Sequence, residues 1–377
     1  MSIYLDYNAT SPILPEVLEG MIDVYRNHYG NSSSRTHTYG QDAKRLVEEA
    51  RKRVAYALSI DPAEVTFTSG STESNNLAIQ GLVPYGVESG KNHMVTTVIE
   101  HSSVLEPMHF LEQLGFKVDY VPVDFSGRVD LERLLSYVND KTLLVSIMHG
   151  NNETGVIQPV KEIGEALAEK GVYFHIDASQ TFGKLILELR SVKYDLLSCT
   201  AHKIYGPQGV GALIARQKRY RRLPIKPLLL GGGQEKGLRP GTVPVALVAG
   251  FGIAVEACIQ HHDLWKGKFL SLRRQVMEQL DLVNHLVNGD QEFCLDNCIN
   301  ISFPGVDSEA LMMAVRNDLA LSNGSACTSY EYRPSHVLKA MGCPSESSIR
   351  ISWGPFTEAI DLTPALAFVR EFSAYIS

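Results

Sequence analysis

The sequence predicts an α/β fold in which a mostly parallel β-sheet is covered by helices. Two observations predict it. Helical and strand patterns alternate from about Gln41 to about Val243, and the runs of strand length are short and rich in apolar and β-branched residues. After about Val243 the pattern changes, which predicts a second, smaller domain.

The elements of the first domain follow one another at short intervals. A helix is expected over 41–58, where apolar residues recur at helical spacing, and a strand at 65–68 precedes the next helix. Five more runs of strand length follow, at 94–99, 143–148, 172–176, 195–199 and 210–214. The later part of the chain predicts a long helical stretch over 243–280, a strand at 298–303, a helix at 308–316 and a strand at 349–352.

The composition indicates a soluble globular enzyme of about two domains, because 44% of the 377 residues are hydrophobic and 20% are charged. No apolar run approaches the roughly 20 residues of a membrane span, and no signal segment begins the chain, so we expect a cytoplasmic protein. The six scattered cysteines do not resemble a disulfide framework, which favours a reducing compartment. Cys294 and Cys298 lack a second pair at ligand spacing, so we expect no metal site.

The formal net charge of -7 argues against direct binding to nucleic acid, which requires many Lys and Arg contacts to phosphate. One stretch, Arg216 to Arg222, is strongly basic although the chain as a whole is acidic. It is either a docking patch for an acidic partner or a solvated turn between strands.

Cys327 is the only cysteine in a small, polar loop, SNGSACTS at 322–329. A thiol that packs in a core usually has apolar neighbours, whereas a reactive thiol needs access and a means of becoming thiolate. We therefore interpret Cys327 as a nucleophile, and the alternative is a buried structural thiol on a loop.

Polar residues follow the expected strands, where ligands gather in open α/β sheets. The strand at 65–68 leads into Gly70, Ser71 and Thr72 at a helix N-terminus, which suits a phosphate. The later strands lead into Glu100 and His101, His149, Asn151 and Asn152, Asp177 and Gln180, and Thr200, His202 and Lys203. Each residue alone could be a capping or loop residue, but together they predict an acid, an imidazole, an amide and a lysine around one crevice.

This set of groups is what pyridoxal phosphate requires. Lys203 would attach the cofactor as a Schiff base, once desolvation or nearby cationic groups lower its pKa. Asp177 would accept the pyridinium N–H and keep the ring cationic. His101 could lie on the ring face and move protons, and Gln180 could hydrogen-bond the phenolic oxygen.

Ordered motifs along nearly the whole chain resemble the pyridoxal-phosphate cysteine desulfurases of the NifS/IscS type, within the class V aminotransferase family. The motifs are YLDYNATSP from Tyr4, FTSGSTESNN from Phe67, MHGNNETG from Met148, HIDASQ from His175, AHKIYGPQGVGAL from Ala201, and SNGSACTS. The resemblance implies fold-type I, with a seven-stranded sheet in a large domain at 14–255 and a small α+β domain formed by 1–13 and 256–377. It also implies a homodimer in which each active site is completed by the partner subunit.

The resemblance also implies roles for individual residues. Lys203, His101, Asp177 and Gln180 match the cofactor contacts expected above, and Cys327 matches the sulfur acceptor. Arg350 matches a group that holds the substrate carboxylate, and its place within the apolar pattern SSIRISWG favours this role over that of a surface arginine. The remaining matches are phosphate contacts at Thr72, Thr200 and His202 assisted by Ser71, Thr242 supplied by the other subunit, and Asn152 beside both the cofactor and the substrate.

The implied activity removes sulfur from L-cysteine, which gives L-alanine and a persulfide on Cys327 for transfer to a protein acceptor. Two alternatives remain open. One is another class V enzyme such as an aminotransferase or a selenocysteine lyase, which would share the cofactor site but depend less on Cys327. The other is a non-catalytic scaffold for sulfur-transfer partners.

Two features depart from the family pattern. Tyr330, Glu331 and Arg333 stand where many relatives carry small or acidic residues, and the chain ends 27 residues after Arg350. These features are compatible with a dedicated pathway such as tRNA thiolation or DNA phosphorothioation, beside general iron–sulfur assembly. The acceptor therefore stays open at this point.

Overall fold

The computed structural model describes residues 2–217, 222–324 and 334–373. Its largest sheet has seven strands in the order β2-β8-β7-β6-β5-β3-β4. All neighbouring pairs from β7 to β4 are parallel, and only β8 runs against its neighbours β7 and β2. The strands are β2 (Val65–Thr68), β3 (His93–Thr97), β4 (Lys117–Val121), β5 (Thr142–Met148), β6 (Tyr173–Asp177), β7 (Leu196–Thr200) and β8 (Gly211–Ala215). The predicted α/β fold with a mostly parallel seven-stranded sheet is thus confirmed.

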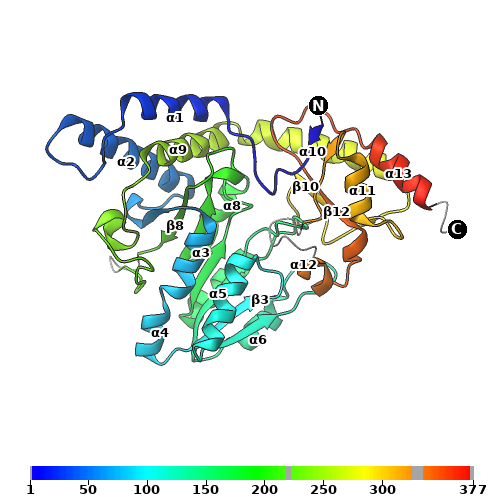
Figure 1. Cartoon of the computed structure of the whole chain (residues 1–377). Coiled ribbons are helices and arrows are strands. Elements are labelled where there is room, and N and C mark those ends of the chain that lie inside the picture. Colours follow the sequence, from blue (N-terminus) through cyan, green and yellow to red (C-terminus); the bar gives the residue numbers. More distant parts are fainter. Residues whose placement is uncertain (1, 218–221, 325–333, 374–377) are drawn as a thin grey trace.

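Helices cover both faces of this sheet, and each face has its own apolar core (Figure 1). Side chains alternate between the two faces along a strand, so Val95 joins one core and its neighbour Met94 joins the other. One core includes residues of α1 (Pro15–Asn27), α2 (Thr38–Leu58), α6 (Leu131–Tyr137), α7 (Val160–Lys170), α8 (Ile186–Ser191) and α9 (Val245–Gln260). The other includes residues of α3 (Ser71–Gln80), α4 (Val83–Ser89) and α5 (Ser102–Gln113).

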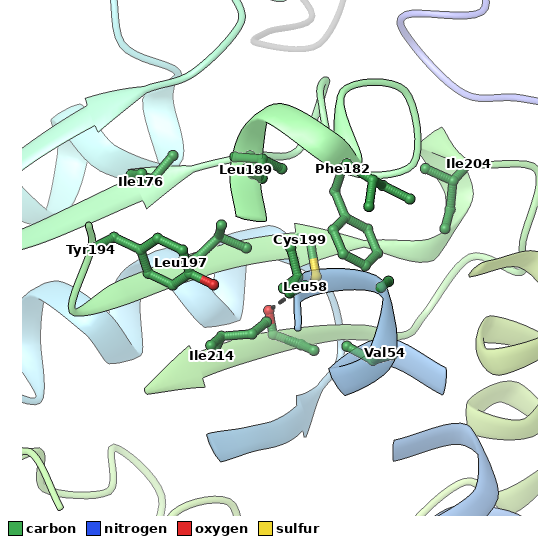
Figure 2. Close-up of a cluster of buried hydrophobic side chains, with 14 of the residues drawn as sticks. Val54, Leu58, Ile176, Phe182, Leu189, Tyr194, Leu197, Cys199, Ile204 and Ile214 are labelled. Atoms are coloured by element: carbon green, nitrogen blue, oxygen red, sulfur yellow. Dashed lines mark hydrogen bonds between the residues drawn. The ribbon is translucent and has the colours of Figure 1, made fainter. Parts of the chain in front are cut away.

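Cys199 illustrates a cysteine used for packing. Figure 2 shows its side chain among apolar neighbours from α2, β7 and β8, including Leu58, Leu197 and Ile214. Its thiol donates to the carbonyl oxygen of Ala212 at 3.7 Å, and burial raises its pKa, so this sulfur is inert. The sheet around it is held by close apolar packing.

A second, antiparallel sheet lies beyond the first and has the order β12-β10-β9. Its strands are β9 (Leu286–Val287), β10 (Cys298–Ser302) and β12 (Ser348–Ser352). With α10 (His262–Leu280), α11 (Ser308–Val315) and α13 (Thr363–Ser373), it encloses a separate core around the buried Trp353. We call this core around Trp353 the second core, and the core that contains residues of α1 and α2 the first core. α12 (His336–Ala340) packs on the first core, through Val337 and Leu338.

The start of the chain belongs beside this second sheet. β1 (Ile3–Tyr4) pairs in parallel with β11 (Leu319–Ala320), and Figure 1 shows the N-terminus next to α10 and α11. The segment from Leu5 to Leu14 then crosses to the first core, which both residues 14 and 17 join. This crossing places N-terminal residues between the two cores.

The long helical stretch expected over 243–280 is interrupted. α9 ends at Gln260 and α10 begins at His262, with a bend of 73° between their axes. The break lets α9 pack against α1 and α2 while α10 packs against the second core. The boundary predicted at residue 255 falls within α9. Within the described ranges, no single helix is long and apolar enough to span a membrane, although the bent pair α9 and α10 together passes a test of length and composition.

Candidate active site

A cavity of about 410 Å³ opens at the carboxyl ends of β5, β6 and β7, where the two cores meet. Its volume lies within the range of small-molecule sites. Eleven of the residues singled out from the sequence line it, and they are Gly70, Ser71, Thr72, His101, Asn152, Asp177, Gln180, Thr200, His202, Lys203 and Arg350. The predicted convergence on one crevice is therefore observed, although their chemical roles remain predictions.

The N-terminus of α3 forms one wall of the cavity. The first turn of an α-helix carries N–H groups without intrahelical partners, and the helix dipole makes this end favourable for an anion. The Ser71 hydroxyl oxygen is buried and has no hydrogen-bond partner. Gly211 lies so close to this turn that a Cβ there would stand 2.7 Å from the Cα of Gly70. A glycine on β8 thus makes room for the turn that begins α3, and the turn fits a phosphate.

Asp177 ends β6 with both carboxylate oxygens held in place. Oδ2 accepts a hydrogen bond from Asn75 Nδ2 at 2.8 Å, and Oδ1 accepts from the Ser179 backbone N–H at 2.9 Å and from the Ser179 hydroxyl. Asn75 also donates to Ser103 Oγ at 2.8 Å. The sequence analysis gave no role to Asn75, Ser179 or Ser103. Asn75 could have been found, because it stands one helical turn after Ser71.

Lys203 follows β7 in a short 3₁₀ turn, Ala201–Lys203. Its Nζ donates to the backbone carbonyl oxygens of Asn8 and, at 2.7 Å, of Ala9. Gln180 Nε2 donates to the same Asn8 carbonyl at 2.9 Å, while Gln180 Oε1 and Asn8 Oδ1 are buried without a hydrogen-bond partner. Two orphaned polar oxygens beside a lysine are what a site for a polar ligand would contain.

Asn8 and Ala9 belong to YLDYNATSP, a motif that the sequence analysis quoted without giving these residues a role. The same segment clamps the turn that carries Lys203. Ser11 Oγ donates to the His202 carbonyl at 2.8 Å and accepts from the Tyr205 backbone N–H at 2.9 Å. The N-terminal segment is therefore a structural part of the cavity.

His101 is held as a neutral imidazole. Its Nδ1 accepts the Ser103 backbone N–H at 3.1 Å, so the ring proton of the neutral form must lie on Nε2. Burial lowers the pKa of His101, and its neighbours Lys203 and His336 lower it further against the opposing effect of Asp177. Burial together with Lys203 lowers the pKa of His202 to about 4. Both imidazoles are thus unprotonated bases near neutral pH.

Arg350, in the middle of β12, carries the buried positive charge of the site. Its side chain is 1% exposed, its Nη1 donates to the Asn152 carbonyl at 2.8 Å, and its Nη2 pairs with Asp6 Oδ1 at 2.5 Å. Its Nε is buried without a partner. Burial opposes the charge, but Asp6, Cys298 and Glu153 together outweigh it and raise the pKa of Arg350. The guanidinium therefore keeps unused donor capacity beside the cavity.

Four described residues that the sequence analysis named do not line this cavity, and they are Glu100, His149, Asn151 and Thr242. Thr242 is exposed. Cys327 lies outside the described residues, as do Tyr330, Glu331 and Arg333. The described residues on either side, Gly324 and Ser335, both approach Glu153, to which Ser335 Oγ donates at 2.5 Å.

The basic stretch is only partly described, because residues 218–221 fall outside the described ranges. Arg216 pairs with Glu64 at 3.3 Å, and Arg222 lines a second cavity of about 270 Å³. Neither a docking patch nor a solvated turn is tested by these contacts.

Comparisons with known proteins find similar sequences along nearly the whole chain. The family model for aminotransferase class V matches residues 3–363. A cysteine desulfurase IscS of Rickettsia felis is 44% identical over 368 residues, which cover 95% of this chain and 87% of the relative.

Solved structures extend this similarity to the fold. A NifS-like protein has a TM-score of 0.89 and is 36% identical, with 100% of this chain and 99% of that chain covered. A structure of SspA in complex with cysteine has a TM-score of 0.81 and is 34% identical, with 94% of this chain and 100% of that chain covered.

Proposed function

Since the chain belongs to the class V aminotransferase family, as a member of its cysteine desulfurase group, we propose that it uses pyridoxal phosphate to move the sulfur of L-cysteine onto Cys327. The products are L-alanine and a persulfide on Cys327. The observation that carries this proposal is the gathering of Lys203, Asp177, His101 and Arg350 around one cavity.

The residues of the cavity fit the proposed cofactor at each of its polar points. Lys203, Asp177 and Gln180 all line the cavity. Lys203 would attach the cofactor, Asp177 would accept the pyridinium N–H, and Gln180 would hydrogen-bond the phenolic oxygen. The helix N-terminus with Ser71, Thr72, Thr200 and His202 holds the phosphate. Bound pyridoxal phosphate supplies an electron sink that stabilises the negative charge left at the α-carbon of the substrate when its proton departs.

The protein's own groups then direct the chemistry. Arg350 and Asn152 would hold the carboxylate of L-cysteine, and neutral His101 would move protons to and from the substrate. The Cys327 thiolate attacks the substrate sulfur, so that a new S–S bond forms. The substrate Cβ–S bond breaks, and its electron pair stays with the carbon fragment, which is protonated and leaves as L-alanine.

A homodimer completes the proposed site. Thr242, matched to a phosphate contact of the other subunit, is exposed and does not line the cavity of its own chain, which supports its use across an interface. Nearby, Leu230 is 92% exposed and Leu229 is 54% exposed, an apolar surface suited to a second copy. We place the dimer in the cytoplasm, with a protein as sulfur acceptor and without direct contact to nucleic acid. The sulfur is destined for iron–sulfur assembly, tRNA thiolation or DNA phosphorothioation.

Intact-protein mass spectrometry with peptide mapping tests the proposal. The holoenzyme is incubated with L-cysteine, L-alanine is quantified, and Cys327→Ala serves as the control. We expect one sulfur atom to be added at Cys327, with matching L-alanine, and neither in the control.

Other outcomes identify the alternatives. Release of alanine from selenocysteine that survives Cys327→Ala indicates a selenocysteine lyase. Bound cofactor with no product from either substrate indicates a non-catalytic scaffold.

A further inference from the structure

Asp6 meets Arg350 because the N-terminal segment runs beside β12. The Ser352 backbone N–H donates to the Leu5 carbonyl at 2.9 Å, and Asp6 forms an isolated parallel bridge with Ser352. Arg350 lies two residues before Ser352 in β12, so the side chains of Arg350 and Ser352 project from the same face of the strand. The aspartate is thus built into the fold next to the guanidinium.

Asp6 contacts Arg350 from outside the cavity. Arg350 lines the cavity, whereas Asp6 does not, and the Asp6 side chain is 20% exposed. Glu153 also acts electrostatically on Arg350, but burial raises the pKa of its carboxyl group. Lys184 is a further positive charge in the same neighbourhood. Asp6 is therefore the ion-pair partner of a guanidinium that also faces the cavity.

A buried guanidinium without a counter-ion is costly, and it binds any available carboxylate strongly. A guanidinium that already has a carboxylate partner has less charge to offer a second one. L-cysteine and L-alanine carry the same free carboxylate group. A high affinity of Arg350 for this group would therefore slow release of the product as well as of the substrate.

We propose that Asp6 sets the affinity of the site for the carboxylate of substrate and product by sharing the charge of Arg350. This inference rests on the proposed role of Arg350 in binding that carboxylate. Asp6 lowers the affinity enough for L-alanine to leave, while it keeps the empty arginine neutralised and in place.

Asp6→Asn keeps a hydrogen-bond acceptor and removes the charge. In the purified holoenzyme, we expect this variant to bind L-alanine about tenfold more tightly and to have a lower KM for L-cysteine, because an Arg350 that has lost its ion pair gains more from the ligand. The increase in Tm produced by saturating propionate should also be larger than in the wild type. That shift can be read even when the variant alone is less stable, and propionate binding requires no sulfur chemistry.

Three control variants isolate the pair. Asp263→Asn makes the same change in net charge at a fully exposed side chain and should leave propionate affinity unchanged. Asp6→Glu retains the charge and should stay near the wild-type affinity. In an Arg350→Gln background, Asp6→Asn should have no effect on propionate binding.

If Asp6→Asn binds propionate and L-alanine as tightly as the wild type or more weakly, the inference is overturned. That result would mean that Asp6 only positions the guanidinium and does not lower its affinity for a carboxylate. An effect of Asp6→Asn that persists without Arg350 would overturn it as well. Failure of the sulfur-transfer assay with the propionate result intact would refute the proposed reaction alone.

Discussion

The side-chain amide of Asn75 donates a 2.8 Å hydrogen bond to Oδ2 of Asp177. Asn75 is on α3, whose first turn forms the wall of the cavity that we assign to the phosphate, and Asp177 ends β6 and also lines the cavity. One helix therefore carries the proposed phosphate wall and also fixes the carboxylate assigned to the pyridinium nitrogen. The two ends of the proposed cofactor are positioned by the same rigid element.

Asn75→Ala should weaken binding of pyridoxal phosphate by roughly 10- to 100-fold, the worth of one hydrogen bond to a charged group. Asp177 would lose a partner of Oδ2 and with it a fixed orientation. Titration of the apoenzyme with the cofactor, followed by absorbance, measures the effect. Asn76→Ala is the matched control, because the neighbouring Asn76 bonds only along its own helix, to Thr72 and Gln80. Equal losses in the two variants would contradict this account.

Gly211→Ala should damage the phosphate wall selectively. A Cβ at this position would lie 2.5 Å from the Cys199 carbonyl oxygen and 2.7 Å from the Cα of Gly70, so backbone must move. We expect affinity for pyridoxal phosphate to fall at least about tenfold while affinity for unphosphorylated pyridoxal changes less. Gly267→Ala is the control, because a Cβ there meets no described atom beyond the adjoining backbone of its own helix within 4 Å. A uniform loss for both ligands would show that the damage is not confined to the phosphate.

Glu100→Gln should remove a pH dependence of stability. Glu100 is fully buried, and desolvation raises its pKa to about 8, so the folded protein keeps a proton that the unfolded chain loses above about pH 4.5. Wild-type stability should therefore fall between pH 4.5 and 8 on account of this group. The variant should be similar to the wild type at pH 4.5 and more stable at pH 8, by about 2 to 5 kcal/mol. Chemical denaturation across this range gives the free energy of unfolding, and parallel curves for the two proteins would contradict the assignment.

Lys184→Met should act with the opposite sign and in a higher pH window. The Lys184 Nζ is buried without a hydrogen-bond partner, and burial lowers its pKa to about 8. The unfolded chain holds this proton up to about pH 10.5, so wild-type stability should rise between pH 8 and 10.5. Below pH 8 the variant should be more stable by about 1 to 3 kcal/mol, and the gain should vanish above pH 10.5. The difference in the free energy of unfolding at pH 7 and pH 10.5 checks this, and a less stable variant at pH 7 would refute it.

Much of the fold could be predicted because the buried strands are short apolar runs between helices. The edge strand β4 was missed, since its sequence KVDYV mixes polar and apolar residues. The break between α9 and α10 was also missed, although the sequence changes there from a nearly all-apolar helix to the polar run His261, His262 and Asp263. Apolar periodicity identifies an element but does not show which core it joins.

Some residues of the candidate site could also be predicted from the sequence, and others could not. Residues that directly follow a strand, such as Asp177 and Lys203, could be placed because parallel strands end at one edge of a sheet. Asp6 could not, because its bond to Arg350 joins residues 344 positions apart. Asn8 and Ala9 act on Lys203 through backbone carbonyl groups, which leave little trace in the amino-acid sequence.

The crossing of the N-terminal segment sets the order in which this protein can be completed during synthesis. Asp6 and Asn8 leave the ribosome long before their partners on β12, which lie 344 positions later in the chain. The seven-stranded sheet can pair before β12 is made, whereas the contact between Asp6 and Arg350 must wait for β12. A nascent chain halted before residue 348 would hold a nearly complete phosphate wall and no formed pair between Asp6 and Arg350.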